Sequence, residues 1–234
     1  MLISPIKPTL KRYWNLFVIN SNISLLRAMQ YESFFSLNLK GKILDFGGGK
    51  KAGYINLLEK KIDLKNYFSV NINNDMQPSF LISEMSKIPI PDDSYEIVFS
   101  LNTLEHVYNI DYSLSELYRV LKPGGELIIS TPFLFRVHGC PNDYQRPTAD
   151  WWDRKTRELN LKDVIIKPLI WDPQTAKFSI SERGGVLGKT IKLSLGFFGL
   201  FYSFLKSGFQ ANHNNETSCY LSSIANGYII TARK

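Results

Sequence analysis

The most constraining feature of the sequence is a series of short apolar runs that begins at residue 42 and alternates with helical patterns. This alternation is typical of a parallel sheet, because each parallel strand needs a crossover connection to the next. Seven runs have the length and composition of strands: 42–46, 67–72, 80–83, 95–101, 126–130, 164–167 and 228–232. The sequence therefore predicts an α/β fold with a seven-stranded sheet.

The segment between the fourth and fifth runs has a clear helical pattern. Ser113 and Glu116 have the spacing of a capping box, and leucines at 114, 117 and 121 recur on one face. The helix is expected to end at Lys-Pro-Gly-Gly, residues 122–125, because proline cannot continue a helix and glycine permits a positive φ. A sharp turn into the fifth strand follows.

The two flanking regions differ from this alternating centre. Residues 1–40 mix aromatic and basic residues in patterns of short amphipathic helices, whereas residues 168–227 separate the last two strands by an unusually long segment. A length of 234 residues fits one domain with additions. We expect a helical N-terminal extension over 1–40 and one α/β domain over 41–234, with a helical insertion at about 168–227.

Composition excludes several classes of protein. With 44% hydrophobic and 21% charged residues, the chain fits a globular protein and neither a disordered nor a collagen-like one. Cys140 and Cys219 lie too far apart for a disulfide framework or a zinc knuckle, and we interpret both as reduced thiols. Pro5 and Pro8 interrupt the only stretch that could serve as a signal peptide, so a cytoplasmic protein is expected.

A glycine turn directly follows the first predicted strand. Gly47, Gly48 and Gly49 come after Ile-Leu-Asp-Phe, where a backbone without side chains can approach a ligand closely. A plain structural turn is the alternative interpretation. A phosphate-binding P-loop is disfavoured, because no Gly-Lys-Ser/Thr follows the turn.

Polar residues follow the next strands in a consistent order. Asn71 comes at the end of the second strand and could hydrogen-bond ribose hydroxyls, while Glu84 and Met85 follow the third and suit an adenine ring. Open α/β sheets bind ligands at these strand ends. Together with the glycine turn, these residues predict a nucleoside site.

Two further motifs carry a family resemblance: Leu-Glu-His-Val at 104–107 and Arg-Val-Leu-Lys-Pro-Gly-Gly at 119–125. With the features above, they make residues 41–150 resemble the class I S-adenosylmethionine-dependent methyltransferases. The resemblance implies S-adenosylmethionine as cofactor and a Rossmann-like, doubly wound seven-stranded sheet whose last strand is antiparallel. It also implies donor-binding roles for six residues: Asp45, Gly47 and Gly49 at the methionine part, Asn71 at the ribose, and Glu84 and Met85 at the adenine.

Two positions depart from the family pattern. Asn71 stands where the family usually has an acid, so the ribose contact loses the strength of a charge-assisted hydrogen bond. Lys51 replaces the third glycine of the familiar Gly-x-Gly-x-Gly. Both departures leave open the alternative of a methyltransferase-like protein that binds without catalysing.

The loop after the fifth strand holds the candidates for acceptor chemistry. His138, Asp143, Tyr144 and Arg146 lie within nine residues, in a stretch similar to one found in part of this methyltransferase branch. We predict His138 as general base, His106 as the second choice, Asp143 as a further catalytic residue, and Tyr144 and Arg146 as acceptor-binding residues. The alternative is a structural clasp in which Asp143 pairs with Arg146. No spacing of ligands predicts a metal site.

An uncharged, aromatic-rich run, residues 193–205, lies between Lys192 and Lys206. It is too short to span a bilayer, which leaves a buried lid or dimer contact, or peripheral contact of residues 187–209 with the inner face of a membrane. The basic excess of the C-terminal region suits an anionic surface. The leading functional hypothesis is O-methylation of a glycan or lipid-linked saccharide, and the alternative enzyme is an RNA methyltransferase.

Overall fold

The computed structural model describes residues 3–84, 86–139, 142–181, 185–207 and 215–234. Its centre is a seven-stranded sheet with the order β3-β2-β1-β4-β5-β7-β6. The strands are β1 (Ile43–Phe46), β2 (Tyr67–Asn71), β3 (Phe80–Leu81), β4 (Tyr95–Leu101), β5 (Leu121–Pro132), β6 (Lys162–Leu169) and β7 (Gly227–Arg233). Only β7 runs antiparallel to its neighbours β5 and β6, as predicted. The predicted Rossmann-like, doubly wound fold is confirmed.

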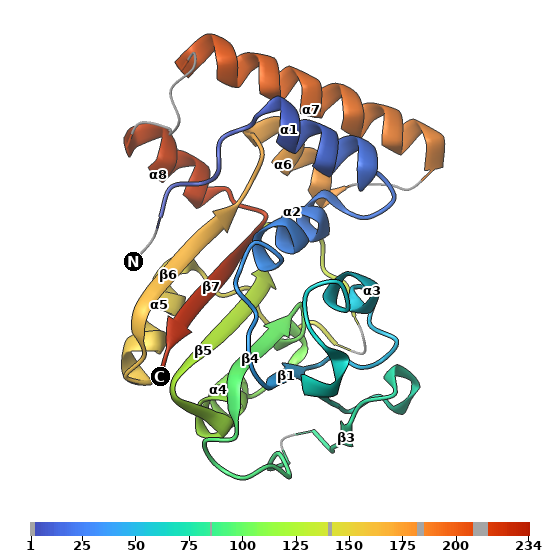
Figure 1. Cartoon of the computed structure of the whole chain (residues 1–234). Helices are drawn as coiled ribbons and strands as arrows, with labels where there is room; N and C mark the ends of the chain where they lie inside the picture. Colours follow the sequence, from blue (N-terminus) through green and yellow to red (C-terminus); the bar gives the residue numbers. More distant parts are fainter. Residues whose placement is uncertain (1–2, 85, 140–141, 182–184, 208–214) are drawn as a thin grey trace.

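Helices lie on both sides of this sheet, as Figure 1 shows. The longer ones are α2 (Leu25–Phe34), α4 (Ile110–Val120), α5 (Ala149–Glu158), α6 (Pro173–Ile180), α7 (Gly185–Ser207) and α8 (Asn215–Ser223). The short ones are α1 (Leu10–Tyr13), η1 (Trp14–Ile19), α3 (Ile55–Leu58), η2 (Leu64–Asn66), η3 (Asn74–Met76) and η4 (Leu104–His106). The N-terminal extension is therefore helical, and the described residues between β6 and β7 form the helices α6, α7 and α8. Among the described residues, none of these helices combines the length and the hydropathy needed to cross a bilayer.

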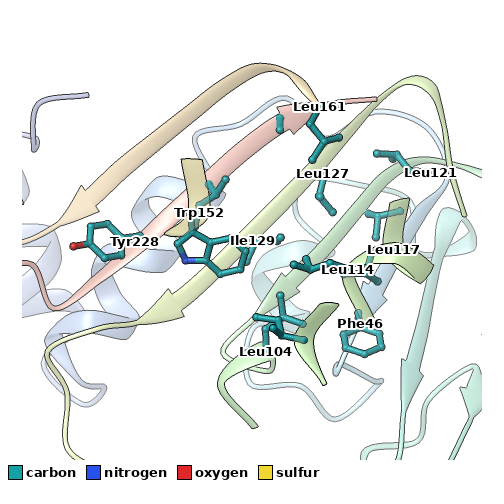
Figure 2. Close-up of a cluster of buried hydrophobic side chains, with 14 of the residues drawn as sticks. Phe46, Leu104, Leu114, Leu117, Leu121, Leu127, Ile129, Trp152, Leu161 and Tyr228 are labelled. Carbon is teal, nitrogen blue, oxygen red and sulfur yellow. The ribbon is translucent and has the colours of Figure 1, made fainter. Parts of the chain in front are cut away.

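The sheet separates two hydrophobic cores, because successive strand residues point to opposite faces. On β5, Leu127 and Ile129 belong to one core and Ile128 to the other. Figure 2 shows the first core, in which Trp152 of α5 and the leucines of α4 pack on the sheet. The second core lies under η1, α2 and α3. Burial on both faces explains why the strands are nearly continuous apolar runs.

The start of α4 differs from the prediction. The helix begins one turn earlier than the expected capping box, with Asn109 as its N-cap accepting a hydrogen bond from the Tyr112 N–H. Ser113 is therefore an internal helical residue. Glu116 instead accepts the backbone N–H of Ile88 at 2.8 Å and pairs with Arg119. The predicted capping box is wrong because Asn109, an equally favourable N-cap residue, precedes Ser113 by one turn and Glu116 binds Ile88 instead.

The turn after α4 is also organised differently. The helix ends at Val120, and residues 121–125 already form the beginning of β5. A bulge separates the pair Tyr95–Leu121 from the pair Ile97–Glu126, and Gly124 takes a φ of +76° within it. The expected sharp turn is thus a bulge in a longer strand, with its glycine conformation as predicted.

Candidate active site

A cavity of about 760 Å³ opens at the carboxyl ends of β1, β2 and β4. The strand order reverses between β1 and β4, which is the position where open α/β sheets bind ligands. Residues at the ends of four different strands line it: Phe46 and Gly47 at the end of β1, 71–73 and Met76 at the end of β2, 82–84 after β3, and 102–103 with 106–107 after β4. His138 and Asn142 close it from the loop after β5.

Gly47 lines the cavity and has a φ of +93°, a conformation that favours glycine. A Cβ at this position would lie 2.0 Å from Thr103 Oγ1, so the turn has no room for a side chain. Gly49 is equally confined, because its Cβ would meet the Met76 carbonyl oxygen at 2.1 Å, but it lies outside the cavity lining. The sequence-predicted turn is therefore tightly packed, and Gly47 is the glycine that borders the cavity.

Asn71 lines the cavity and braces the glycine turn. Its Nδ2 donates to the carbonyl oxygens of Gly47 at 2.7 Å and Gly48 at 3.0 Å. Its Oδ1 accepts the Asn73 N–H at 2.9 Å. A carboxylate could not donate to either carbonyl. The amide of Asn71 is therefore needed to donate the hydrogen bonds that hold the glycine turn, which the sequence alone did not indicate.

Asp45 lies beneath the turn and is fully buried. Its Oδ2 accepts the hydroxyl groups of Tyr54 and Tyr67, each at 2.6 Å. Burial raises the pKa of Asp45 to about 7, although both hydrogen bonds act in the opposite direction. Asp45 does not line the cavity, so the structure places it as a support for the turn. Its predicted contact with the donor stays a prediction.

Glu84 is exposed and lines the cavity on the side of β3. Its carboxylate is therefore accessible to a ligand in the cavity, as the nucleoside interpretation requires. Met85, the predicted adenine contact beside it, lies outside the described residues.

The two predicted base candidates face the same cavity. His106 and His138 have ring centroids 5.1 Å apart in an edge-to-face arrangement. The Nδ1 atom of His138 lies 3.3 Å from the Arg136 carbonyl oxygen, and the Nδ1 atom of His106 contacts the Asn142 carbonyl oxygen. An Nδ1–H that donates to a carbonyl leaves Nε2 as a proton acceptor. Burial lowers the pKa of His138, which favours its neutral, basic form.

Asp143 and Arg146 form the structural clasp that the sequence left as an alternative. The guanidinium of Arg146 holds both carboxylate oxygens of Asp143, and Asp143 Oδ2 also accepts the His138 backbone N–H at 2.8 Å. Burial raises the pKa of Asp143, but these hydrogen bonds outweigh it and leave the pKa below its ordinary value. Neither residue lines the cavity. Their predicted catalytic and acceptor-binding roles stay predictions, and their observed contacts fix the loop that carries His138.

Tyr144 lies at the outer surface of this loop with 43% of its side chain exposed, so it does not fill the core. Its ring packs edge-to-face against Tyr108 with centroids 5.4 Å apart. Its hydroxyl accepts a hydrogen bond from Asn142 Nδ2 at 2.9 Å, and Asn142 lines the cavity. The two tyrosines form an exposed aromatic pair beside the cavity.

Glu105 is the residue that sequence reasoning missed. Its side chain is fully buried, and within the described chain neither carboxylate oxygen has a hydrogen-bond partner. Burial raises its pKa to about 7, and Oε1 lies 3.7 Å from His106 Nε2. Glu105, His106 and His138 each offer one ligand atom within 4.8 Å of the others, a donor set suited to a transition-metal ion. Because two loops contribute these residues, no local spacing in the sequence predicts the group.

Comparison with known proteins agrees with this geometry. Residues 44–129 match the family model described as a methyltransferase domain. A probable S-adenosylmethionine-dependent methyltransferase of Mycolicibacterium smegmatis is 38% identical over 102 residues, covering 44% of this chain and 35% of that protein. Residues 44–129 are therefore similar to the methyltransferase domain of S-adenosylmethionine-dependent methyltransferases, in agreement with the resemblance that the sequence motifs indicate. S-adenosylmethionine is the cofactor of this family.

Two further methyltransferases extend the similarity. A malonyl-[acyl-carrier protein] O-methyltransferase of Buchnera aphidicola is 29% identical over 154 residues, covering 63% of this chain and 61% of its own. The crystal structure of a SAM-dependent methyltransferase from Archaeoglobus fulgidus superposes with a TM-score of 0.56 at 16% identity, covering 88% of this chain and 91% of that one. The second comparison shows a shared methyltransferase fold. The chain spans about a third of the length of the Mycolicibacterium protein.

Proposed function

We propose that this chain transfers a methyl group from S-adenosylmethionine to a hydroxyl group of a glycan or lipid-linked saccharide. The observation that carries the proposal is the position of His138 and His106 on the same cavity as Gly47, Asn71 and Glu84. This arrangement brings candidate bases next to the candidate donor site.

The donor side of the cavity fits the cofactor. The volume of about 760 Å³ is within the range of small-molecule sites, and the backbone of Gly47, packed closely against Thr103, forms part of the cavity wall. Gly47 would border the methionine part, Asn71 the ribose and Glu84 the adenine. S-adenosylmethionine supplies a methyl group on a positively charged sulfur, which is already activated for transfer. The chain therefore has mainly to align the reactants and exclude water.

The acceptor side supplies a base. A hydroxyl group must lose its proton as its oxygen bonds to the methyl carbon and the carbon–sulfur bond breaks. His138 suits this task because burial lowers its pKa and keeps the imidazole neutral near pH 7. The Asp143–Arg146 clasp holds the loop in place, so Asp143 acts as a positioning residue.

Two observations support a saccharide hydroxyl as acceptor. The exposed pair Tyr108 and Tyr144 offers aromatic faces against which the apolar faces of sugar rings can pack, and Arg146 lies two residues further along. The Buchnera relative is named an O-methyltransferase, which supports oxygen as the methylated atom. Its acceptor, a malonyl group on a carrier protein, is one alternative outcome of the test.

The test is transfer of a labelled methyl group from S-adenosylmethionine into a host extract, followed by separation into glycolipid, polysaccharide, RNA, protein and small-molecule fractions. The proposal predicts label in glycolipid or polysaccharide, and loss of this label with the His138→Ala variant. Label in RNA or carrier protein would overturn the acceptor assignment. No label in any fraction, beside an active control methyltransferase, would overturn the proposed activity.

A further inference from the structure

Helix α7 buries small and polar side chains against the protein and exposes many of its large apolar ones. The fully buried positions are small or polar, namely Gly188, Lys192, Gly196, Gly199 and Ser203, and Leu193 and Leu200 pack partly buried against the second core. The opposite side carries large apolar residues, which are 38–74% exposed: Leu187, Ile191, Phe197, Phe198, Phe201 and Leu205. We call these six residues the α7 face. An amphipathic helix on a protein in water normally buries its apolar side, so this face is suited to another environment.

Close contacts fix the orientation of α7. A Cβ at Gly196 would lie 2.5 Å from the Phe17 ring, and one at Gly199 would lie 2.3 Å from Asp172 Oδ2. Trp171 Nε1 donates to the Gly196 carbonyl oxygen at 3.0 Å, and Lys192 Nζ donates to the carbonyl oxygen of Ile23 at 2.8 Å. The helix cannot rotate to bury its apolar side without losing these contacts. The α7 face therefore points away from the core.

The α7 face is not a lid over the candidate active site. No described residue of α7 lines the cavity, which lies at the carboxyl ends of the central strands. Figure 1 shows α7 beside α1 in a separate layer, and an edge-to-face contact joins Tyr13 to Phe197. The expectation of a buried lid helix over the active site is therefore wrong. Leu10 and Trp14, on the neighbouring α1 and η1, are also largely exposed.

Charge indicates what covers the α7 face. Residues 10–19 and 185–207 contain no acidic residue, and of their basic residues Arg12 pairs with Glu32 while Lys192 is buried. Lys11 and Lys189 are exposed among them. A second copy of the chain would oppose this basic excess with its own, whereas an anionic bilayer would attract it. Basic residues flanking a large aromatic and leucine face are typical of helices that lie in a membrane interface.

We propose that the α7 face docks on an anionic lipid bilayer, with α7 lying in the plane of the membrane interface. At 23 residues, α7 is about 35 Å long and inserts along its side, with the phenylalanines at the headgroup–acyl boundary. This inference rests on α7 and its charges, and it does not depend on the methyl-transfer reaction.

The test is co-sedimentation of the full chain with vesicles of phosphatidylcholine alone or mixed with phosphatidylglycerol. We expect strong binding to the anionic vesicles, weak binding to the neutral ones, and weakening at high salt. The double variant Phe198→Gln, Phe201→Gln should bind the anionic vesicles at least about tenfold more weakly. Glutamine keeps good helix propensity, so circular dichroism should show an intact fold.

The matched control is the double variant Leu64→Gln, Leu81→Gln, which removes two exposed apolar side chains far from α7 in the chain. It should bind the anionic vesicles like the wild type. Equal binding by the α7 variant and this control would overturn the proposal, as would a wild type that stays in the supernatant. A wild-type dimer that the α7 variant converts to a monomer, seen by light scattering, would assign the face to a second copy instead.

Discussion

Glycine allows close packing both at the donor side of the cavity and along helix α7, but the close packing has a different consequence in each region. Gly47 has a positive φ and borders the cavity, and the Thr103 side chain occupies the place that a side chain of residue 47 would take. Gly196 and Gly199 are helical and let α7 approach Phe17 and Trp171 closely. In the first region the missing side chain lets Thr103 pack against the turn that borders the cavity; in the second it lets α7 pack on the protein with its large side chains outward. The same residue type therefore indicates function only when its neighbours are known.

The two regions also differ in how their polar groups are satisfied. At the cavity, Asn71 donates to two carbonyl oxygens of the glycine turn, and Asp45 accepts two tyrosine hydroxyls beneath it. On α7 the outward side has large apolar side chains and nearby lysines. We infer that the first region is preorganised for a small molecule and the second for a surface.

The largest effect is expected for His138→Ala. If His138 removes the acceptor proton, the variant should transfer methyl groups about 10²–10⁴-fold more slowly while its donor affinity stays unchanged. The wild-type rate should fall as the pH drops through the pKa of His138, which lies below the ordinary value. In the variant, this fall in rate at low pH should be absent. Initial rates across pH and calorimetric titration with S-adenosylhomocysteine provide both measurements. An unchanged rate would exclude His138 as base.

A large effect on donor binding is expected for Gly47→Ala, because the new Cβ would collide with Thr103. Donor affinity should fall by at least about 100-fold, from steric conflict in addition to the cost of a positive φ. Gly124→Ala is the matched control, since Gly124 also has a positive φ, of +76°, but a Cβ there would meet no atom within 4 Å. Equal donor affinities for the two variants would show that strain alone, and not close approach at the cavity, matters.

Asp45→Asn tests the buried support beneath the turn. The folded-state pKa of Asp45 is raised from 3.8 to about 7, so the folded wild type holds a proton that the unfolded chain has already released. The contribution of this bound proton to the free energy of unfolding is complete below pH 3.8 and is lost as the pH rises toward 7. Between about pH 5.5 and 7.5 the wild type should lose about 2 kcal/mol that the variant does not lose.

Urea unfolding of both proteins at the two pH values measures this difference. The shift of Glu105 to a similar pKa affects both proteins equally and cancels in the comparison. If the stability of wild type and variant depends on pH in the same way, the raised pKa of the buried Asp45 carboxyl is contradicted.

The smallest effect is expected for Glu84→Ala. Glu84 lines the cavity, and if its exposed carboxylate accepts a hydrogen bond from the bound nucleoside, its removal should weaken donor binding about tenfold. Glu59→Ala is the control, because Glu59 is an equally exposed acid that does not line the cavity. Titration with S-adenosylhomocysteine separates the two. If both variants bind like the wild type, the adenine assignment fails.

Much of the fold could be predicted from the sequence, because strands buried on both faces have to be apolar throughout. All seven strands were found, and β4 has the predicted bounds. The errors lie where alternatives compete locally. Asn109 caps α4 in place of Ser113, and the Lys-Pro-Gly-Gly segment joins β5 as a bulge. Such choices depend on pairing partners that are distant in the sequence.

The site was predictable only where chain order implies spatial proximity. Gly47, Asn71 and Glu84 follow parallel strands, whose ends meet at one edge of the sheet. Glu105 could not be recognised, because its burial next to His106 and His138 depends on the packing of two loops. Arg27 of α2 also lines the cavity, and no pattern in the N-terminal helices indicates it. The orientation of α7 likewise followed from glycine contacts across the chain.

The central claim is that S-adenosylmethionine binds in the cavity between the glycine turn and the loop that carries His138, and that the α7 face takes no part in this binding. Amide hydrogen exchange with and without S-adenosylhomocysteine tests it most directly. The account predicts slower exchange on binding at residues 46–49, 71–76 and 102–107, with no change in the exchange of α7. Saturable binding that leaves these cavity segments unchanged, or that protects α7 instead, would contradict it.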